Sequence, residues 1–484
     1  MEKYVCIDIG ASSIKVGLSY IQNNKIIFEK IHMATNKIYK KENKIVWDID
    51  MLFDEILIAL KKIKSMRINK CNLSIDTWGV DYVLIDKSGN IIDSVYSYRD
   101  KRTNNFFKKQ KTFNFEDVYL KTGVYPLEFN TMFQLYQHKI WEFKELDKIL
   151  FIPDYFIYML TGKKIADVSN LSTSQLYDIS TGNIREDFLE ILKIKKEHFG
   201  DIVQPGTKIG KTLKKLETKY DIPECTIWSV ASHDTASAFL AASTDNNNDV
   251  LISSGTWSLL GLIVDKPIIY RDALREGFTN LVGFNKSILF LKNITGMWIL
   301  QETERNLSHK FSIVDFINEA IKYERFNYLM NCEDDRYTVP ENMIYEIWKY
   351  FNETHQSVPY NIGELIRCII DSLALCYSKN IFNLEKIANK KINNIHIFGG
   401  GCRNKILNQT LADICKKNVI AGLVDATMIG NIIVQMLGNK EIDNENAAKK
   451  IIRDSFQFEI YKPDNINYQS VINKFNMIIE MGKK

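Results

Sequence analysis

Two segments that lie far apart in the chain share one pattern, and this pattern limits the possible folds more than any other feature. VCIDIGASSIKVGLSY (residues 5–20) and VLISSGTWSLLGLIV (residues 250–264) both read as an apolar strand, a tip of Gly and hydroxyl residues, and a second apolar strand. Each segment therefore predicts a β-hairpin. We interpret the two hairpins as the starts of two duplicated units, and two unrelated hairpins are the alternative.

The length of the chain requires more than one hydrophobic core. It has 484 residues, and cores stop growing at roughly 250–300 residues. Short β-rich runs alternate with longer helical runs, which is the pattern of α/β layers. We therefore predict an α/β protein with two domains, residues 1–245 and 246–484, and we place the boundary in the polar run Ser243–Asp249.

Local patterns predict the elements of the first domain. The expected strands are residues 4–10, 16–21 and 25–31, followed by an amphipathic helix at 49–64 and one buried strand at 71–86. Residues 106–195 are predicted to be a mostly helical insertion. In the second domain, the pattern near residue 400 predicts a strand, a glycine turn and a helix.

Composition and charge exclude several classes of protein. Lys and Arg number 63 against 59 Asp and Glu, and no long basic stripe is present, so we predict no nucleic acid partner. No segment approaches the roughly 18 apolar residues of a membrane span, and the N-terminus does not resemble a signal peptide. The eight cysteines include no C-x-x-C pair, which argues against structural zinc. We expect a cytoplasmic protein with reduced thiols and no membrane partner.

The tips of the two hairpins are candidate phosphate sites. Gly10–Ser13 with Lys15 nearby, and Ser254–Thr256, would expose backbone N–H groups and hydroxyl donors that suit phosphate oxygens. Either tip alone is more typical of an ordinary turn. Their occurrence at the start of two successive units favours a two-sided phosphate clamp.

Other residues fit a nucleotide site without the usual phosphate loop. Asp8 ends the first strand, where a carboxylate would bind Mg²⁺ directly or through water; capping of turn amides is the equal alternative. No G-x-x-x-x-G-K-[ST] run is present, so a Walker-type loop is excluded. Gly399–Gly401 lie between a predicted strand and helix, where the backbone can approach a flat or anionic ligand, although a glycine triplet is weak evidence.

Two further motifs suggest a base and a sugar contact. Asp234 follows the strand TIWSVA and precedes a helix of small residues, where its carboxylate would stay ionised as a proton acceptor; a helix cap without chemistry is the alternative. The segment Ile75–Tyr82 combines Trp78, a glycine, Asp76 and Asp81. An aromatic face beside polar groups suits a sugar, and core packing with turn-forming carboxylates fits equally well.

Taken together, these motifs resemble the FGGY carbohydrate kinases. The resemblance rests on DIGASSIK, SIDTWGVDYVLID, SYRDKR, ASHDTASA, ISSGTWSLLG, GGGCRNKILNQTLAD and ATMIGNIIVQ, and it runs from residue 4 to about 438. It implies two ribonuclease-H-like domains of the actin, sugar kinase and chaperone-ATPase superfamily, with a cleft between a sugar-binding first domain and a nucleotide-binding second domain. The implied reaction transfers the γ-phosphoryl group of ATP, with Mg²⁺, to the 1-hydroxyl of L-rhamnulose.

The resemblance also implies roles for individual residues. Asp234 corresponds to the catalytic base. The implied sugar-binding residues are Gly79, His233, Thr235 and Asn293. To these we add, from the residue chemistry above, Trp78 and Asp81 as sugar-binding residues and Asp8 as the metal-binding residue. The implied ATP-binding residues are Ala11, Ser12, Ser13, Ile14, Lys15, Thr256, Gln301 and one of the two glycines Gly400 and Gly401. The first loop of the family usually reads closer to GASSGR, whereas Ile14 and Lys15 stand here, and Lys15 keeps the positive charge.

Three other functions deserve comparison with this interpretation. A kinase for L-fuculose or another ketose differs only in a few hydroxyl contacts, which spacing does not resolve. An actin-like ATPase would use the same hairpins but would not need the tryptophan motif or a carboxylate beside His233. A sugar-sensing repressor would need a DNA-binding module, and the chain begins directly with a strand. We expect a monomer or a homodimer.

Overall fold

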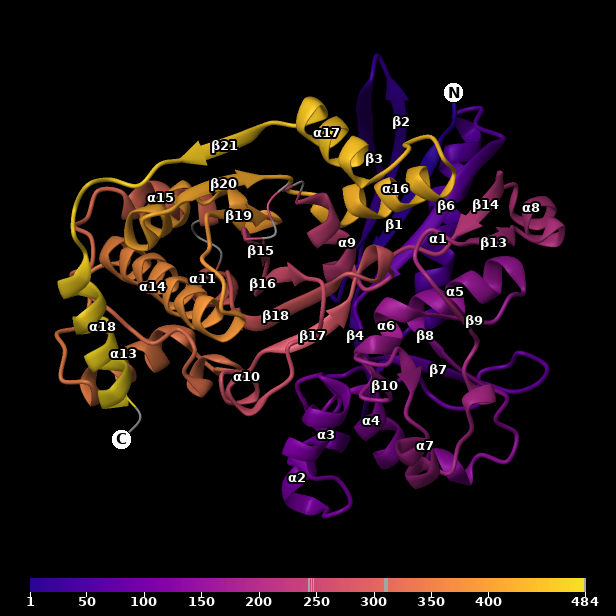
Figure 1. Ribbon diagram of the computed structural model, residues 1–484, viewed down its shortest axis with the longest axis horizontal. Helices are drawn as coiled ribbons and strands as arrows, with labels where there is room; N and C mark the ends of the chain where they lie inside the picture. The colour runs from indigo at the N-terminus through magenta and orange to yellow at the C-terminus, as the bar shows by residue number, and fades with distance from the viewer. Residues whose placement is uncertain (243, 245, 247, 309–311, 483–484) are drawn as a thin grey trace. The chain divides into compact units, whose positions relative to one another are not determined.

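The computed structural model describes residues 1–242, 244, 246, 248–308 and 312–482. The chain forms two compact units (Figure 1). The first contains residues 1–245, 263–290 and 426–455, and the second contains residues 246–262, 291–425 and 456–484. Residues 243, 245 and 247 of the predicted boundary lie outside the described residues.

The elements of the first unit alternate between strands and helices. Its strands are β1 (Tyr4–Ile9), β2 (Ser13–Gln22), β3 (Lys25–Thr35), β4 (Ile38–Lys41), β5 (Lys44–Trp47), β6 (Lys70–Thr77), β7 (Tyr82–Ile85), β8 (Lys148–Phe151), β9 (Ile165–Asp167), β10 (Tyr177–Asp178), β11 (Asn183–Ile184), β12 (Asp201–Val203), β13 (Lys208–Lys211), β14 (Glu224–Trp228) and β17 (Thr279–Val282). Its helices are α1 (Ile49–Ser65), α2 (Phe106–Lys109), α3 (Phe115–Thr122), α4 (Thr131–Gln137), α5 (Ile152–Thr161), α6 (Val168–Ser172), α7 (Glu186–Leu192), α8 (Lys214–Tyr220), α9 (Asp234–Ala241), α10 (Arg271–Arg275), α16 (Ala426–Gly438) and α17 (Glu445–Ser455).

The second unit is built from a smaller set. Its strands are β15 (Val250–Ser254), β16 (Trp257–Val264), β18 (Ile288–Thr295), β19 (Asn394–Phe398), β20 (Asn418–Gly422) and β21 (Phe458–Tyr461). Its helices are α11 (Trp298–Asn306), α12 (Ile313–Ala320), α13 (Met343–Glu353), α14 (Ile362–Ala388), α15 (Lys405–Cys415) and α18 (Gln469–Gly482).

Both large sheets use the same arrangement of strands. The first sheet has the order β3-β2-β1-β6-β14-β13, and the second has the order β17-β18-β16-β15-β19-β20-β21, so six positions correspond and β17 is an additional strand at one edge of the second sheet. In each sheet the first hairpin is antiparallel, two parallel strands follow, and an antiparallel strand closes the edge. This agreement supports the interpretation of the two hairpins as parts of a duplicated unit, and it confirms the predicted α/β fold class.

Two helices of the first unit cross at very short distance beside its sheet. Helix α16 comes late in the sequence, yet it packs against α9 and against β1 and β6 (Figure 1). A Cβ added to Gly430 would lie 1.8 Å from the Ser237 carbonyl oxygen, so only glycine permits this approach. The start of α9 is therefore held by a helix that follows residue 425.

Two local predictions were wrong in detail. The expected single strand at residues 71–86 is two strands in different sheets, because the chain turns over Trp78–Asp81 and Val80 has a φ of +68°. Strand β7 pairs with β8 instead of extending β6. The expected mostly helical insertion at residues 106–195 contains α2 to α7, but also the short strands β8 to β11. The helix expected at residues 49–64 is confirmed as α1.

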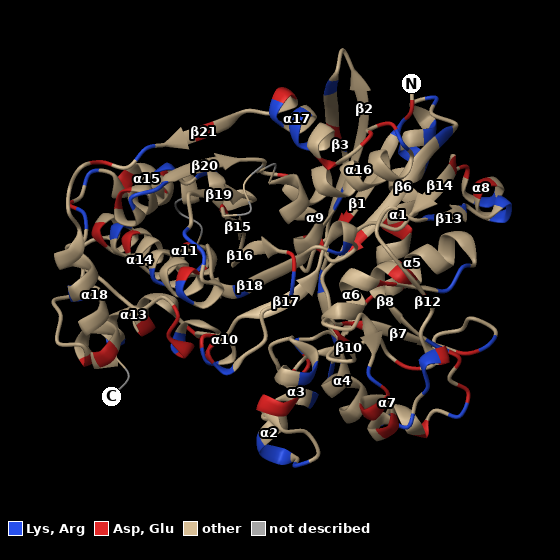
Figure 2. Cartoon of the chain, viewed as in Figure 1, with Lys and Arg blue, Asp and Glu red and all other residues tan. Residues whose placement is uncertain are grey.

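Lys and Arg residues are interspersed with Asp and Glu residues along the described chain (Figure 2). Among the described residues, no helix has both the length and the apolar character that crossing a membrane would require.

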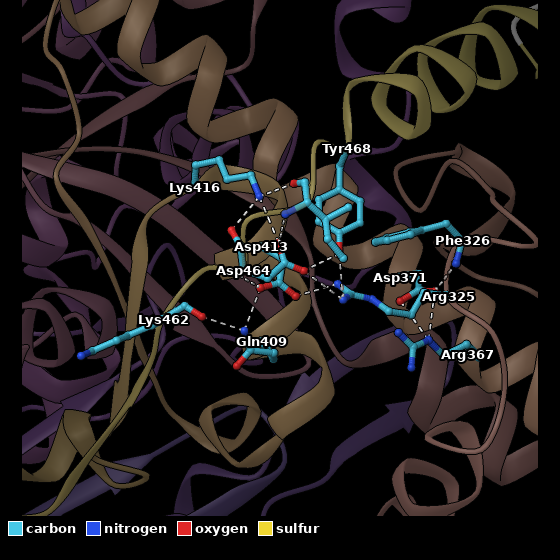
Figure 3. Close-up of polar contacts among 11 residues, drawn as sticks. Arg325, Phe326, Arg367, Asp371, Gln409, Asp413, Lys416, Lys462, Asp464 and Tyr468 are labelled. Atoms are coloured by element: carbon cyan, nitrogen blue, oxygen red, sulfur yellow. Dashed lines mark hydrogen bonds and ion pairs between the residues drawn. The ribbon is translucent and has the colours of Figure 1, made fainter.

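An arginine-centred cluster attaches the C-terminal segment to the second unit (Figure 3). The Arg325 Nη2 atom lies 2.9 Å from Asp413 Oδ2, and Arg325 Nη1 donates to the Tyr468 hydroxyl at 3.1 Å. The Tyr468 hydroxyl donates in turn to Asp464 Oδ2 at 2.6 Å, and the Asp464 N–H donates to Asp413 Oδ1 at 3.0 Å. Residues 456–484 are therefore part of the second unit and not a separate tail.

We predict that Arg325→Met lowers stability, because it removes a cation from Asp413, whose side chain is only 2% exposed. Since Arg325 itself is partly exposed, the expected loss is about 2 kcal/mol, below the full cost of breaking a buried pair. Thermal melting should fall by about 4–8 °C. The control is Arg271→Met, whose ion pair with Glu116 is exposed and should contribute little. Equal melting of both variants and the unmodified protein would contradict the structural role of Arg325.

Candidate functional site

The first hairpin tip is a rigid turn. The Gly10 N–H donates to the Ser13 carbonyl oxygen at 2.8 Å, which closes the turn. Asn36, just after β3, also binds this turn. Its Nδ2 donates to the Gly10 carbonyl oxygen at 2.8 Å, and its N–H donates to the Ser12 carbonyl oxygen at 3.1 Å. The side chain of Ile14 is buried in the core, so any contact of Ile14 with a ligand goes through its backbone.

Two carboxylates meet at the carboxyl ends of β1 and β6. Asp8 lies opposite Asp76 in the parallel register of these strands and opposite Lys15 in the antiparallel register with β2. The Lys15 ammonium group lies 3.0 Å from Asp8 Oδ2. Both carboxylates are buried, so they interact through a medium that screens charge less than water does.

Asp76 lacks full compensation for its charge. Asn431 Nδ2 on α16 donates to Asp76 Oδ2 at 2.5 Å, whereas Asp76 Oδ1 is buried without a hydrogen-bond partner among the described residues. Burial, followed by the negative charge of Asp8, raises the pKa of Asp76 well above its usual value. The end of β6 therefore has an acceptor that could receive a cation or a donor.

These residues fit a Mg²⁺ ion that is shared with phosphates. Among the described residues, no group of three or more His, Cys, Asp or Glu side chains could enclose a metal. Mg²⁺ commonly uses one or two carboxylates and completes its shell with water and phosphate oxygens. Asp8 and the unpartnered oxygen of Asp76 match that donor set, so the prediction of Asp8 as a metal-binding residue is compatible with the structure.

The segment at the start of α9 brings His233, Asp234 and Thr235 together. His233 Nδ1 lies 3.1 Å from Asp234 Oδ1, and the Thr235 N–H and hydroxyl donate to the same oxygen at 2.5 and 3.1 Å. All three groups can donate to Asp234 Oδ1 only when His233 carries a proton on Nδ1. The alternative contact, in which the Thr235 N–H donates to His233 Nδ1 at 3.2 Å, is the longer one.

The pKa of Asp234 is set by opposing effects. Partial burial acts to raise it, but the hydrogen bond and charge of His233 and the donors of Thr235 hold it below its usual value. The Asp234 side chain remains 34% exposed. The helix cap and the ionised carboxylate that the sequence predicted as alternatives therefore occur in the same segment.

The His233 ring packs directly on Gly79. A Cβ added to Gly79 would lie 2.7 Å from His233 Cδ2 and 3.2 Å from Thr173 Oγ1. An isolated parallel bridge between Thr77 and His233 joins the same two segments. The structure therefore brings the predicted residues Gly79, His233 and Asp234 together.

Asp81 organises the aromatic residues around this turn. Trp47 Nε1 and Trp78 Nε1 donate to Asp81 Oδ2 at 2.7 and 2.9 Å, and Gln134 Nε2 donates to Oδ1 at 2.9 Å. The carboxylate is 1% exposed, and burial raises its pKa despite these donors. Asp81 fixes the position of the two tryptophan rings, whose centroids are 4.2 Å apart, and its predicted contact with a sugar remains a prediction.

In the second unit, the predicted nucleotide residues gather around Ser254. The Met297 and Trp298 N–H groups donate to the carbonyl oxygens of Gly255 and Thr256 at 2.9 and 3.0 Å, which joins the second hairpin tip to the start of α11. A Cβ added to Gly401 would lie 2.0 Å from Ser254 Oγ, so this loop requires glycine. Thr256 and Gly400 are exposed beside it.

The last two predicted residues lie on neighbouring elements of the second unit. Gln301 is on the first turn of α11 and is half-buried. Asn293 is exposed near the end of β18. The roles predicted for all these residues, and the cleft implied by the resemblance, remain predictions.

Sequence reasoning missed several residues that support the site. Asn36 and Asn431 donate to the hairpin tip and to Asp76, but a single Asn gives no local signal. Asp167 accepts bonds from the segment before His233. The pattern Asp167-x-Ser169 is typical of a helix cap, and this signal could have identified Asp167 as an N-cap.

We predict that Asp76→Asn raises the melting temperature at pH 7.5. Above the usual Asp pKa of about 3.9, the unfolded chain has lost this proton while the folded protein retains it, so ionisation reduces stability as the pH rises toward the folded pKa. The gain should therefore shrink at pH 4. The control Asp86→Asn should show no gain, because hydrogen bonds from Asn90 lower the pKa of this exposed carboxyl. A lower melting temperature for Asp76→Asn at both pH values would contradict the prediction.

Comparisons with known proteins agree with this fold. The N-terminal domain of the FGGY family of carbohydrate kinases matches residues 3–241, and its C-terminal domain matches residues 250–438. Among solved structures, a ligand-bound xylulose kinase from Lactobacillus acidophilus matches with a TM-score of 0.82 at 16% identity, covering 100% of this chain and 97% of that chain. A Plasmodium falciparum glycerol kinase with ADP matches with a TM-score of 0.79 at 15% identity, covering 100% and 98%.

Two full-length relatives share much more sequence identity with this chain than those solved structures do. A rhamnulokinase of Bacillus subtilis (strain 168) is 40% identical over 477 residues, covering 98% of both chains. A rhamnulokinase of Enterococcus faecalis is 38% identical, covering 99% of this chain and 97% of the relative. Because both domain matches and these full-length relatives agree with the two-unit fold, the chain belongs to the FGGY family of carbohydrate kinases.

Proposed function

We propose that this enzyme transfers the γ-phosphoryl group of ATP to the 1-hydroxyl of L-rhamnulose, giving L-rhamnulose 1-phosphate and ADP. The chemical step is supported mainly by the unequal use of the two oxygens of Asp234. The sugar is supported by full-length similarity to rhamnulokinases at 35–40% identity. ATP is the donor expected of a carbohydrate kinase.

One oxygen of Asp234 remains for proton transfer. Every hydrogen bond that Asp234 accepts from the described residues goes to Oδ1, from Thr235 and His233. These contacts fix the carboxylate and leave Oδ2 for the hydroxyl of a substrate. Asp234 would orient the 1-hydroxyl and accept its proton as the new P–O bond forms and ADP leaves.

A low pKa does not prevent this role. The donors of His233 and Thr235 stabilise the ionised carboxylate, which makes Asp234 a weak base. In a loose phosphoryl-transfer transition state, the nucleophile loses its proton late, so orientation of the hydroxyl counts for more than basicity. The low pKa also keeps the carboxylate ionised at all pH values near neutrality.

In this proposal, residues of the two hairpin tips bind phosphate oxygens of ATP. Residues 11–15 in the first unit and Thr256 with the 399–401 loop in the second provide backbone N–H groups, hydroxyls and the Lys15 ammonium group for phosphate oxygens. Asp8 would hold Mg²⁺, with Asp76 nearby as a second carboxylate. When bound, Mg²⁺ supplies positive charge that neutralises the phosphates.

The turn that contains Gly79 is the proposed binding site for the sugar. The absence of a side chain at Gly79 leaves the His233 ring against the backbone, and the Trp78 ring is held by Asp81 nearby. An aromatic face suits the apolar methyl end of a deoxyketose, and His233 and Thr235 offer polar contacts to hydroxyls. A monomeric or homodimeric cytoplasmic enzyme remains our expectation.

We predict that L-rhamnulose gives the highest kcat/KM in a coupled ADP-release assay across L-rhamnulose, L-fuculose, L-xylulose and glycerol. The rival sugars differ in hydroxyl positions, and a site built for one hydroxyl pattern rejects another because polar groups are left unpaired. A higher kcat/KM for L-fuculose would replace the proposed substrate and leave the kinase assignment intact. ATP hydrolysis that no sugar stimulates would instead support the actin-like alternative.

We predict that Asp234→Asn lowers kcat by at least about a hundredfold, which is within the range for loss of a general base. The amide retains the size of the side chain and removes its capacity to accept a proton. The affinity for ATP, measured by titration calorimetry, should stay within about twofold, because Asp234 is not proposed to contact ATP. A variant with more than about a tenth of the original kcat would refute the assignment of Asp234 as the base.

A further inference from the structure

A buried aspartate outside the predicted site accepts five hydrogen bonds. Asp167 is 0% exposed and caps α6. Its Oδ1 accepts from the Ser169 N–H at 3.0 Å, from the Ser169 hydroxyl, and from the Ser232 N–H and hydroxyl at 3.2 and 2.9 Å. Its Oδ2 accepts from the Ser229 hydroxyl at 2.9 Å. These donors offset part of the cost of burying the carboxylate.

The donors come from the segment that leads to the base. Ser229 and Ser232 lie between the end of β14 and the start of α9. The His233 N–H donates to the Ser169 hydroxyl at 3.1 Å, and this hydroxyl donates to Asp167 Oδ1. Asp167 therefore holds His233 through one intervening hydroxyl and holds Ser232 directly.

The same segment is held from a second side by β6. The Thr77 N–H donates to the Ser232 carbonyl oxygen at 2.9 Å. Asn170 Nδ2 donates to the Ser232 hydroxyl at 2.9 Å, so this hydroxyl both accepts a bond and donates one to Asp167. Ser232 is thus the residue at which the bonds from β6, α6 and Asp167 meet, two positions before Asp234.

The pattern differs at Ser229. Its N–H donates to the Thr207 carbonyl oxygen at 2.8 Å, and its carbonyl oxygen accepts from the Gly206 N–H at 2.8 Å. The main chain therefore fixes Ser229 against the 206–207 turn, whatever its side chain does. Loss of the Ser229 hydroxyl removes a bond to Asp167 without freeing the segment that carries Asp234.

We propose that Asp167 is a positioning residue for phosphoryl transfer, which acts through Ser232 and Ser169 to fix His233 and the base Asp234. It does not contact the sugar or ATP in this proposal. The inference rests on the proposed function, because it requires Asp234 to be the base. Positioning is significant because a misplacement of about 1 Å in a reacting group can cost roughly a hundredfold in rate.

A matched pair of serine variants tests this proposal in the full-length enzyme. Ser229 and Ser232 are each 1% exposed, and each donates its hydroxyl to Asp167 at 2.9 Å. Ser232→Ala should lower kcat at least about tenfold with the KM for ATP unchanged, whereas Ser229→Ala should stay within about twofold in kcat. The Ser232 hydroxyl makes two hydrogen bonds and the Ser229 hydroxyl makes one, so the melting temperature should fall more in Ser232→Ala than in Ser229→Ala.

The outcomes separate positioning from a purely structural role. Equal effects of the two substitutions on kcat, whether both small or both large, would overturn the proposal. If Ser232→Ala does not fold, Ser169→Ala replaces it with the same thresholds, because it removes the bridge between His233 and Asp167. Asp167→Asn should retain more activity than Asp167→Ala, since an amide oxygen in the place of Oδ1 still accepts from Ser169 and Ser232.

The test can fail independently of the proposed function. The assays use whichever sugar has the highest kcat/KM in the substrate panel, so an error in the sugar does not affect the comparison of the serine variants. If Asp234→Asn remains active, the base assignment fails by that result alone. If Asp234→Asn is inactive while Ser232→Ala has normal kcat, only the positioning role of Asp167 is refuted.

Discussion

The parallel pairing of β1, β6 and β14 is the constraint on which the rest of the first unit depends. Parallel strands end at one edge of their sheet, so residues from distant parts of the sequence meet there. Asp8 and Asp76 end two of these strands, and Thr77 forms a bridge with His233 beyond the third. A slip of one residue between β1 and β6 would turn Asp76 to the opposite face and separate it from Asp8.

This pairing concentrates negative charge, which is compensated by one element close in the sequence and by one far away. Lys15 on β2 approaches Asp8, and Asn431 on α16 donates to Asp76. Helix α16 reaches this depth only because Gly430 lets it pass the backbone of Ser237 on α9. The chemistry at the edge of the first sheet therefore depends on a glycine that the chain supplies after residue 425.

Sequence patterns predicted those parts of the site that depend on local order along the chain. Asp234 at a helix start and the Gly–Ser hairpin tips are local signals, and the α/β class followed from alternating runs. The turn within residues 71–86 was missed because its composition continues to resemble a buried strand, although Val80 adopts a positive φ. Trp47 donates to Asp81 and Ser229 donates to Asp167 from distant segments, and no local pattern indicates that a buried carboxylate will meet such a donor.

The carboxylates in the first unit differ in the donors that they receive, and this difference separates their capacities. Asp234 receives three contacts on Oδ1, from His233 and Thr235, and its pKa falls. Asp76 is wholly buried, receives one bond from Asn431, and its pKa rises. The environments of these two aspartates thus shift their pKa values in opposite directions, as happens for paired acids and bases in enzymes. An ionised Asp234 can accept a proton, whereas the ionised form of Asp76 has one donor, Asn431, and would be further stabilised by a cation or a donor that approaches its free oxygen. A cation bound beside Asp8 would therefore favour the ionised form of Asp76.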